Sequence, residues 1–178
     1  TLPPGRNSIF KGIKNTTIID SAYNANLDSM SAVLGMFDKI KAEKKWMILG
    51  DMLEQGNSEK QEHERLAEEI SKVKYDKIIL MGPRVSKYTF PKLITNNALP
   101  AGRQESRITN HEKVVKFINP DEVLKYLREH IKGEETILFK GARFLEGVVE
   151  HLLADKEDVK KLCRQEKVWR IRRRQWGL

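Results

Sequence analysis

Short apolar runs alternate with longer stretches that carry apolar residues at helical spacing along this chain. The short runs are typical of strands and the longer stretches of amphipathic helices. The predicted strands are Ser8–Ile13, Thr16–Asp20, Trp46–Leu49, Lys77–Met81, Val114–Ile118 and Thr136–Phe139. The predicted helices are Leu27–Lys41, a helix from Ser58, Arg84–Leu93, Pro120–Lys132, Phe144–Leu153 and a helix from about Lys156. Since helices between strands imply crossover connections, we predict an α/β fold: a Rossmann-like three-layer domain with a mainly parallel sheet of about six strands and helices on both faces.

The end of the chain differs in composition from the rest. The net charge is +8, and the segment from Arg164 to Leu178 holds six basic residues and one acidic residue, interleaved with tryptophans. Such a segment is compatible with binding to RNA, to an anionic membrane or to an acidic partner. The favoured interpretation is a final helix or strand whose tryptophans pack on the domain while its arginines stay solvated. We therefore predict one domain at residues 1–153 and a basic helical extension of it at residues 154–178.

Several classes of protein lack support in the sequence. No apolar run reaches the roughly 18 residues of a membrane-spanning helix, and no signal-peptide pattern opens the chain, so we expect a cytoplasmic protein without stable membrane insertion. The single cysteine, Cys163, is interpreted as a half-buried helix residue. The histidines have no metal-ligand spacing, so no metal site is predicted. The chain also lacks the glycine pattern of a phosphate-binding loop. The segment Thr95–Glu112 lacks periodicity and is predicted to be an exposed loop.

Three predicted strands end in polar segments, at the position where open α/β sheets present ligand-binding groups. The motif D-x-x-Y-N-A-N-x-x-S-M occupies Asp20–Met30, L-G-D-M-x-E-x-G occupies Leu49–Gly56, and K-G-A-R occupies Lys140–Arg143. Near the start of the chain stands Pro4-Gly5-Arg6. Taken together and in this order, the motifs strongly resemble those of the C-terminal domain of the Mur ligase family, over about Pro3 to Leu153.

The resemblance implies an ATP-dependent ligase that builds peptidoglycan precursors. Proteins of this family are similar in having one domain for a UDP-sugar, a central domain with a phosphate-binding loop, and a C-terminal domain that this chain resembles. The motifs are closest to those of members that join D-alanyl-D-alanine to UDP-N-acetylmuramoyl-tripeptide through an acyl phosphate. The implied partners are these two substrates, ATP with Mg²⁺, and the absent N-terminal and central domains. We expect a monomer that binds no nucleic acid, and a chain that is inactive and holds no cofactor alone.

The resemblance places the first motif on the nucleotide side of the site. A carboxylate, a phenol and two amides offer hydrogen-bonding partners for ribose hydroxyls or an adenine edge. The implied nucleotide-binding residues are Arg6, Asp20, Tyr23, Asn24 and Asn26. Two alternatives remain open: the asparagines shape and cap the turn before the following helix, and the arginine is an ordinary surface residue.

The other two motifs are implied to face the incoming dipeptide. Arg143 suits its terminal carboxylate, because a guanidinium can donate two parallel hydrogen bonds. Lys140 and Asp51 are the implied catalytic residues, the lysine stabilising negative charge and the aspartate receiving or deprotonating the ammonium group. The implied substrate-binding residues are Gly50, Asp51, Met52, Glu54, Gly141 and Arg143. The alternatives are a surface ion pair between Lys140 and Asp51, and helix capping by Glu54 and His63.

Two other functions remain open. One is a sibling Mur-type ligase or a folylpolyglutamate or cyanophycin ligase, against which the Asn24-Ala25-Asn26 and Asp51-Met52 sequences argue. The other is a nucleic-acid or membrane-surface module that acts through the basic end of the chain. RNA binding that is weakened by salt and lost on deletion of Arg164–Leu178 would support the second.

Overall fold

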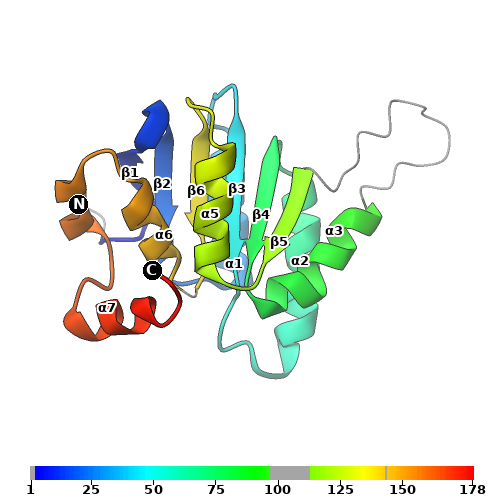
Figure 1. Ribbon diagram of the computed structural model, residues 1–178. Coiled ribbons are helices and arrows are strands. Elements are labelled where there is room, and N and C mark those ends of the chain that lie inside the picture. Colours follow the sequence, from blue (N-terminus) through cyan, green and yellow to red (C-terminus); the bar gives the residue numbers. More distant parts are fainter. Residues whose placement is uncertain (1–2, 97–112, 143) are drawn as a thin grey trace.

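A six-stranded sheet forms the centre of the protein. The computed structural model describes residues 3–96, 113–142 and 144–178 (Figure 1). The strands are β1 (Ser8–Lys11), β2 (Thr17–Ser21), β3 (Lys45–Gly50), β4 (Lys77–Met81), β5 (Val114–Phe117) and β6 (Thr136–Lys140). Their order in the sheet is β1-β2-β6-β3-β4-β5, and all neighbours are parallel except β1 and β2. The predicted mainly parallel sheet of about six strands is therefore confirmed.

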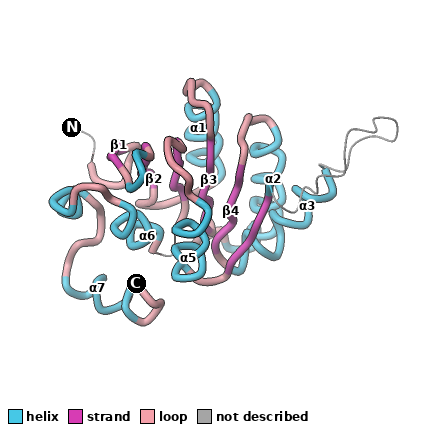
Figure 2. Tube along the Cα trace, turned by 45° about the horizontal axis from the view of Figure 1, so that its top comes forward, coloured by secondary structure: helices cyan, strands magenta, loops and turns pink. Residues whose placement is uncertain are grey.

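Helices cover both faces of this sheet, as the sequence predicts (Figure 2). One face carries α1 (Leu27–Asp38), α2 (Glu59–Ser71) and α3 (Phe90–Asn96), and the other carries α5 (Pro120–His130) and α6 (Leu145–Leu152). A last helix, α7 (Lys167–Arg174), lies beside the domain near the C-terminus. The result is a three-layer domain with two hydrophobic cores, one on each side of the sheet.

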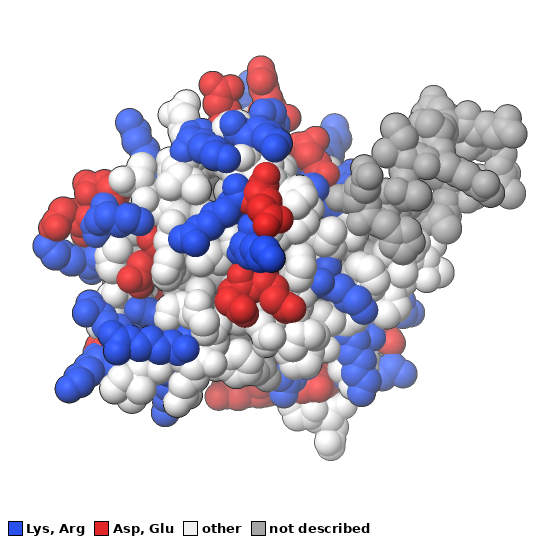
Figure 3. Space-filling view, in the orientation of Figure 1, with Lys and Arg blue, Asp and Glu red and all other residues white. Residues whose placement is uncertain are grey.

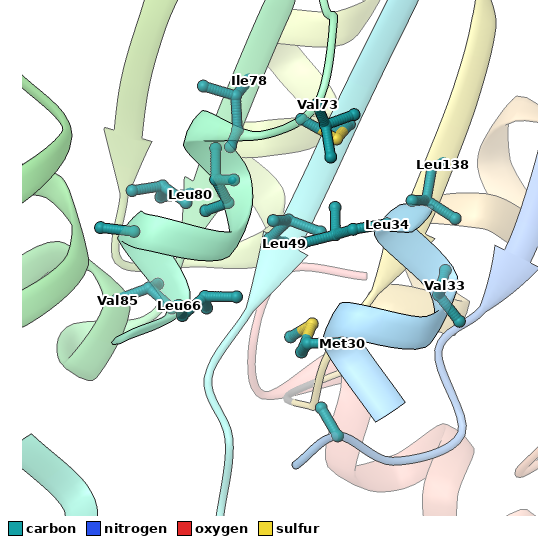
Figure 4. Packing of buried hydrophobic residues seen from close by; sticks show 14 of the residues in the cluster. Met30, Val33, Leu34, Leu49, Leu66, Val73, Ile78, Leu80, Val85 and Leu138 are labelled. Atoms are coloured by element: carbon teal, nitrogen blue, oxygen red, sulfur yellow. The ribbon is translucent and has the colours of Figure 1, made fainter. Parts of the chain in front are cut away.

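The two cores follow from the alternation of side chains along each strand. In β3, Met47 and Leu49 belong to the core beneath α1 and α2, whereas Trp46 and Ile48 belong to the core beneath α5 and α6. Figure 4 shows the first core, in which α1 packs its apolar side chains onto the strands. Burial of each such side chain contributes about 1.5–3 kcal/mol, and with both faces covered the whole of β3 is buried.

Local sequence signals explain the turn between β1 and β2 and the start of α5. The turn between β1 and β2 is a 3-10 turn, η1 (Ile13–Asn15), with Lys14 and Asn15 at φ of 52° and 60°. At the start of α5, Pro120 occupies the first turn, where a missing N–H is harmless, and the Glu122 carboxylate accepts the N–H of Asn119 at 3.1 Å. The two strands predicted on either side of the turn form an antiparallel hairpin, and the predicted start of the helix at Pro120 is confirmed.

Three details differ from the sequence predictions. The predicted helix Arg84–Leu93 begins with a π-helical turn, η3 (Val85–Thr89), before α3. The helix predicted from about Lys156 is a 3-10 segment, η4 (Lys156–Lys161). Cys163 is wrongly predicted as a half-buried helix residue: the chain leaves helical conformation at Leu162, which turns both side chains inward, and Cys163 is only 6% exposed. The loop predicted at Thr95–Glu112 falls mostly outside the described residues.

The basic end of the chain packs on the domain more closely than predicted. Leu153 and Ala154 pair with the edge strand β1 through a bridge to Gly12 and a 3.0 Å hydrogen bond to the Lys11 carbonyl. Arg173 is 4% exposed and lies 3.1 Å from the Glu150 carboxylate. The prediction of solvated arginines is therefore wrong for this residue, because the buried Glu146 and the partly buried Glu150 of α6 give its guanidinium anionic partners. In the described part of the chain, no helix is long and apolar enough to span a bilayer.

Candidate functional site

The loops that follow β2, β3 and β6 lie along one edge of the sheet. These three strands are parallel neighbours, and Lys140 at the end of β6 pairs with Ser21 of β2 and Leu49 of β3. Their carboxyl ends must therefore meet at the same edge. The N-terminal segment reaches this edge as well, since the Gly5 carbonyl accepts the N–H of Tyr23 at 3.2 Å. The predicted site residue Arg143 lies outside the described residues.

A pocket of about 430 Å³ opens between the N-terminal segment, the loop after β2, the first turns of α1 and the end of β6. This volume is in the range of small-molecule binding sites. Five predicted site residues line it: Arg6, Tyr23, Asn24, Asn26 and Lys140. The structure therefore brings together four of the five predicted nucleotide-binding residues with one predicted catalytic residue.

Lys140 carries a positive charge to the floor of this pocket. Its side chain is 6% exposed, and its Nζ donates a 2.6 Å hydrogen bond to the Asn24 carbonyl. Burial lowers the pKa of Lys140, the nearby Arg6 lowers it further, and Asp20 opposes both effects. The lysine thus ties the end of β6 to the loop after β2 and adds to the positive potential of Arg6.

The two asparagines of the loop shape the turn and also face the pocket. The Asn24 Oδ1 accepts the N–H of Ala25 at 2.8 Å. The Asn26 Oδ1 accepts the N–H of Ser29 at 2.9 Å and caps α1. Within the described residues, the amide Nδ2 groups make no hydrogen bond to protein, and both side chains are exposed. Turn formation and ligand binding are therefore compatible at these positions.

Tyr23 presents its ring at the rim of the pocket. Tyr23 is 46% exposed, and the guanidinium carbons of Arg6 and Arg164 lie 5.3 Å and 5.5 Å from the centre of its ring. A cation near an aromatic face is an attractive contact, so both arginines help to hold the ring at the rim.

Asp20 lies beneath this loop and does not line the pocket. Its carboxyl group is fully buried, and Oδ1 accepts the N–H of Ala22 at 3.0 Å. Its Oδ2 has no hydrogen-bonding partner among the described residues. Burial raises the pKa of Asp20 to about 6. A ribose contact by Asp20 stays a prediction, and in this structure the residue acts on the loop from below.

Asp51, at the end of β3, accepts hydrogen bonds from the start of the next helical segment. It is 0% exposed, and Oδ1 accepts the N–H groups of Arg84 and Val85, each at 3.0 Å. The Arg84 guanidinium lies 3.5 Å from Oδ2 and also bonds Glu59. Gly82 makes room, because a Cβ there would lie 2.5 Å from the Asp51 Oδ1. A surface ion pair between Lys140 and Asp51 is wrong, because both side chains are buried.

Met52, the residue after Asp51, is buried in the same way. Met52 is 0% exposed, and its N–H donates a 3.1 Å hydrogen bond to Nε2 of the buried His63. The other ring nitrogen, Nδ1, lies 2.7 Å from the Glu59 carbonyl, which fixes the proton on Nδ1. His63 thus holds the loop onto α2. Glu54 is exposed at a φ of 61°, so among the predicted residues of this loop it is available to a ligand.

Gly50 and Gly141 are required by the contact between two strand ends. A Cβ on Gly141 would lie 2.4 Å from the Cα and N atoms of Gly50, and φ of Gly141 is +141°. Gly141, which the resemblance implies to bind substrate, is thus first of all the residue that lets the ends of β6 and β3 lie in contact.

Sequence reasoning missed the residues that surround Asp51 and Asp20. For Asp51 a signal existed, since Gly82-Pro83 ends β4 and a helix begins at once beside the end of β3. For Asp20 there was none, because Glu146 and Arg164, whose charges act on its carboxyl group, lie more than a hundred residues away in sequence.

Residues 5–143 match the profile of a protein family described as "Mur ligase, glutamate ligase domain". The chain belongs to the Mur ligase family. A UDP-N-acetylmuramoyl-tripeptide–D-alanyl-D-alanine ligase of Rickettsia prowazekii is 31% identical to this Mur ligase domain over 144 residues, which are 80% of the chain and 28% of the relative. The enzyme of the same name from Bacillus subtilis is 29% identical over 153 residues, or 83% of the chain and 30% of the relative.

Solved structures of Mur ligases share this fold. A crystal structure of MurF from Acinetobacter baumannii has a TM-score of 0.67 at 25% identity, covering 87% of this chain and 32% of that one. MurF of Thermotoga maritima, crystallised with ADP, has a TM-score of 0.61 at 22% identity, covering 90% of this chain and 32% of that one. This Mur ligase domain therefore spans about 30% of the length of the curated relatives that it matches.

Proposed function

We propose that this chain works as the C-terminal domain of an ATP-dependent ligase that joins D-alanyl-D-alanine to UDP-N-acetylmuramoyl-tripeptide. One observation carries the proposal: in a Mur ligase domain, the predicted motif residues of the N-terminal segment, β2 and β6 converge on one pocket. The names of the relatives support this choice of substrates. We further propose that the ligase is cytoplasmic, because ATP is its co-substrate, and that it acts as a monomer.

The residues of the pocket fit a nucleotide. Arg6 and Lys140 supply positive charge for phosphate groups. The Nδ2 groups of Asn24 and Asn26 can donate to a base or ribose, and Tyr23 adds a partly exposed aromatic side chain. The related MurF of Thermotoga maritima was crystallised with ADP. In the ligase, ATP supplies the phosphoryl group that activates the peptide carboxylate.

We assign Mg²⁺ binding to other parts of the ligase. Among the described residues, no group of three His, Cys, Asp or Glu side chains could hold a metal ion. The contribution of this domain to the nucleotide is therefore electrostatic and positional: Lys140 and Arg6 place positive charge beside the phosphates, and the loop after β2 orients the base.

We propose that the dipeptide binds beside the ends of β3 and β6. Arg143 would hold its terminal carboxylate through paired hydrogen bonds, and Glu54 is exposed toward solvent on the same edge. Asp51 would act indirectly, because its carboxylate is buried against Arg84 and Val85. We expect Arg143→Ala to raise the dipeptide KM about tenfold or more, with the nucleotide KM nearly unchanged. An equal rise in both would place Arg143 on the nucleotide side of the cleft.

A chimeric enzyme tests the proposal. This chain would replace the matching C-terminal segment of the Bacillus subtilis relative, and ADP release would be measured with UDP-N-acetylmuramoyl-tripeptide and different amines. We expect turnover with D-alanyl-D-alanine and none with D-glutamate or diaminopimelate, with the product confirmed by mass spectrometry. The isolated chain is the control and should show no turnover. Turnover with a single amino acid in place of the dipeptide would identify a sibling ligase instead.

A nucleic-acid module is less well supported than the ligase. Figure 3 shows Lys and Arg side chains gathered near α7, but Arg164 and Arg173 make ion pairs with buried Glu146. The Arg172 guanidinium lies 4.9 Å from the centre of the Trp169 ring. Part of the basic charge is therefore used inside the protein.

A further inference from the structure

A buried acid joins α6 to the basic end of the chain. Glu146, in the first turn of α6, is 0% exposed. Its Oε2 lies 3.3 Å from Nη1 of Arg164, and its Oε1 lies 3.8 Å from Nη1 of Arg173. Burial raises the pKa of Glu146, while the two guanidinium groups counter this effect. The free-energy cost of burying this carboxyl group thus depends on residues near the C-terminus.

The same guanidinium of Arg164 also binds the loop after β2. Its Nη2 donates a 2.5 Å hydrogen bond to the Tyr23 carbonyl, and its Nη1 lies 3.3 Å from the Ala22 carbonyl. Its central carbon lies 5.5 Å from the centre of the Tyr23 ring. One side chain therefore connects α6 to the main chain that carries Tyr23 and Asn24 into the pocket.

Arg164 is itself held in place by its neighbours. Its φ is +56°, in the left-handed region that costs a non-glycine residue of order 1 kcal/mol. Its carbonyl accepts a 3.1 Å hydrogen bond from Nη1 of the buried Arg173, and the Trp169 ring lies 5.2 Å from its guanidinium. A strained backbone fixed by these contacts gives the side chain one orientation, toward the loop.

We propose that Arg164 is a positioning residue for nucleotide binding: it fixes the Ala22–Tyr23 main chain against Glu146 and so sets the geometry of the pocket. This inference rests on the proposed ligase function, because it takes the ligand of the pocket to be ATP. The family profile ends at residue 143, so this support comes from a part of the chain that the profile does not cover.

Hydrogen exchange of the 178-residue chain tests the structural half of the inference without reference to any activity. In Arg164→Ala, amides between Ala22 and Asn26 should exchange about tenfold faster than in the unsubstituted chain, and Arg164→Lys should fall between the two. The matched control is Arg170→Ala in α7, because the Arg170 side chain is exposed and forms no ion pair among the described residues. Circular dichroism establishes that each variant is folded, and Glu146→Gln provides a second variant with the same expected direction.

The chimeric ligase tests the functional half. Arg164→Ala should raise the KM for ATP about tenfold, leave the dipeptide KM within about twofold, and be partly rescued by Arg164→Lys. Unchanged exchange in the loop would overturn the inference, and so would faster exchange with an unchanged KM for ATP. A chimera that is inactive without any substitution would instead count against the proposed function, while the exchange result still decides whether Arg164 holds the loop.

Discussion

The loops after β2 and β3 look alike in sequence, but the structure makes one open and the other closed. Each follows a largely buried strand, has an aspartate at or next to the strand end, and leads into a helix. The loop after β2 presents exposed Tyr23, Asn24 and Asn26 to a pocket. The loop after β3 directs Asp51 and Met52 inward, where their polar groups bond Arg84, Val85 and His63.

The difference lies in what stands beside each strand end. Next to β3 is the start of a helical segment whose N–H groups need an acceptor, and Asp51 supplies it. Next to β2 is the main chain of the N-terminal segment, which bonds Tyr23, and the loop projects outward. One Asp20 carboxylate oxygen has no hydrogen-bonding partner in the part of the chain that the structure describes. A strand-end carboxylate is thus a ligand group or a structural one according to its spatial neighbours.

The largest effect should follow from closing the space between the two strand ends. Gly141→Ala would place a Cβ 2.4 Å from the Gly50 backbone at a φ of +141°. We expect a loss of about 4 kcal/mol in the free energy of unfolding, measured by urea denaturation. The control is Gly35→Ala in α1, where a Cβ meets nothing within 4 Å and the change should be at most about 1 kcal/mol, in the stabilising direction. Equal effects would contradict the close contact.

The next effect concerns Asp20 and depends on pH. Burial raises the pKa of Asp20 to about 6 from its ordinary value of 3.8, so the folded protein holds this proton more tightly than the unfolded chain. Its contribution to stability is fully present below about pH 4 and lost as the pH rises through 6, by about 3 kcal/mol. Asp20→Asn should therefore gain stability relative to the unsubstituted protein over this window. Denaturation curves at pH 4 and 7.5 with no relative change would contradict the assignment.

A smaller loss is expected for Asp51→Asn. It removes the charge that faces two N–H groups and the Arg84 guanidinium, for about 2 kcal/mol at pH 7. Thermal unfolding measures this loss, and dipeptide kinetics of the chimera provide the second readout. A large rise in the dipeptide KM at unchanged stability would show that Asp51 contacts the substrate.

The smallest effect is expected for the cap of α1. Asn26→Ala removes the acceptor of the Ser29 N–H and should cost about 1 kcal/mol. Asn26→Asp keeps an acceptor but removes the Nδ2 donor that faces the pocket. It should keep the stability while it raises the KM for ATP in the chimera. If both variants bind ATP normally, the capping role alone accounts for Asn26.

Much of the fold could be predicted because each strand is a compact apolar run and each crossover has a helical period. The strand β4 has the predicted bounds, Lys77–Met81. The helix α5 begins at Pro120, as predicted, because Asn119 and Pro120 act through local backbone geometry. The candidate pocket could be predicted as a set of loops, since parallel strands end at one edge. Its residue roles still await the experiments above.

What could not be predicted depends on contacts between distant segments. The inward turn of Asp51 needs Gly82 and the N–H groups of Arg84 and Val85 beside it. The burial of Arg173 needs the acids of α6, of which Glu146 is buried only because the chain is folded. The spacing of hydrophobic residues predicts which face of a helix or strand is buried. It does not predict which charged side chains of other elements pack against that face.

The antiparallel direction of β1 has a mechanical consequence. Because β1 runs opposite to its neighbour, the segment before it starts at the edge where the parallel strands finish, and Gly5 is bonded to the Tyr23 main chain there. In any longer protein that carried this domain behind other polypeptide, the connecting link would enter beside the pocket. If the domain rotated about such a link, Arg6 would move little because it lies next to the link. Residues farther from the link would move most.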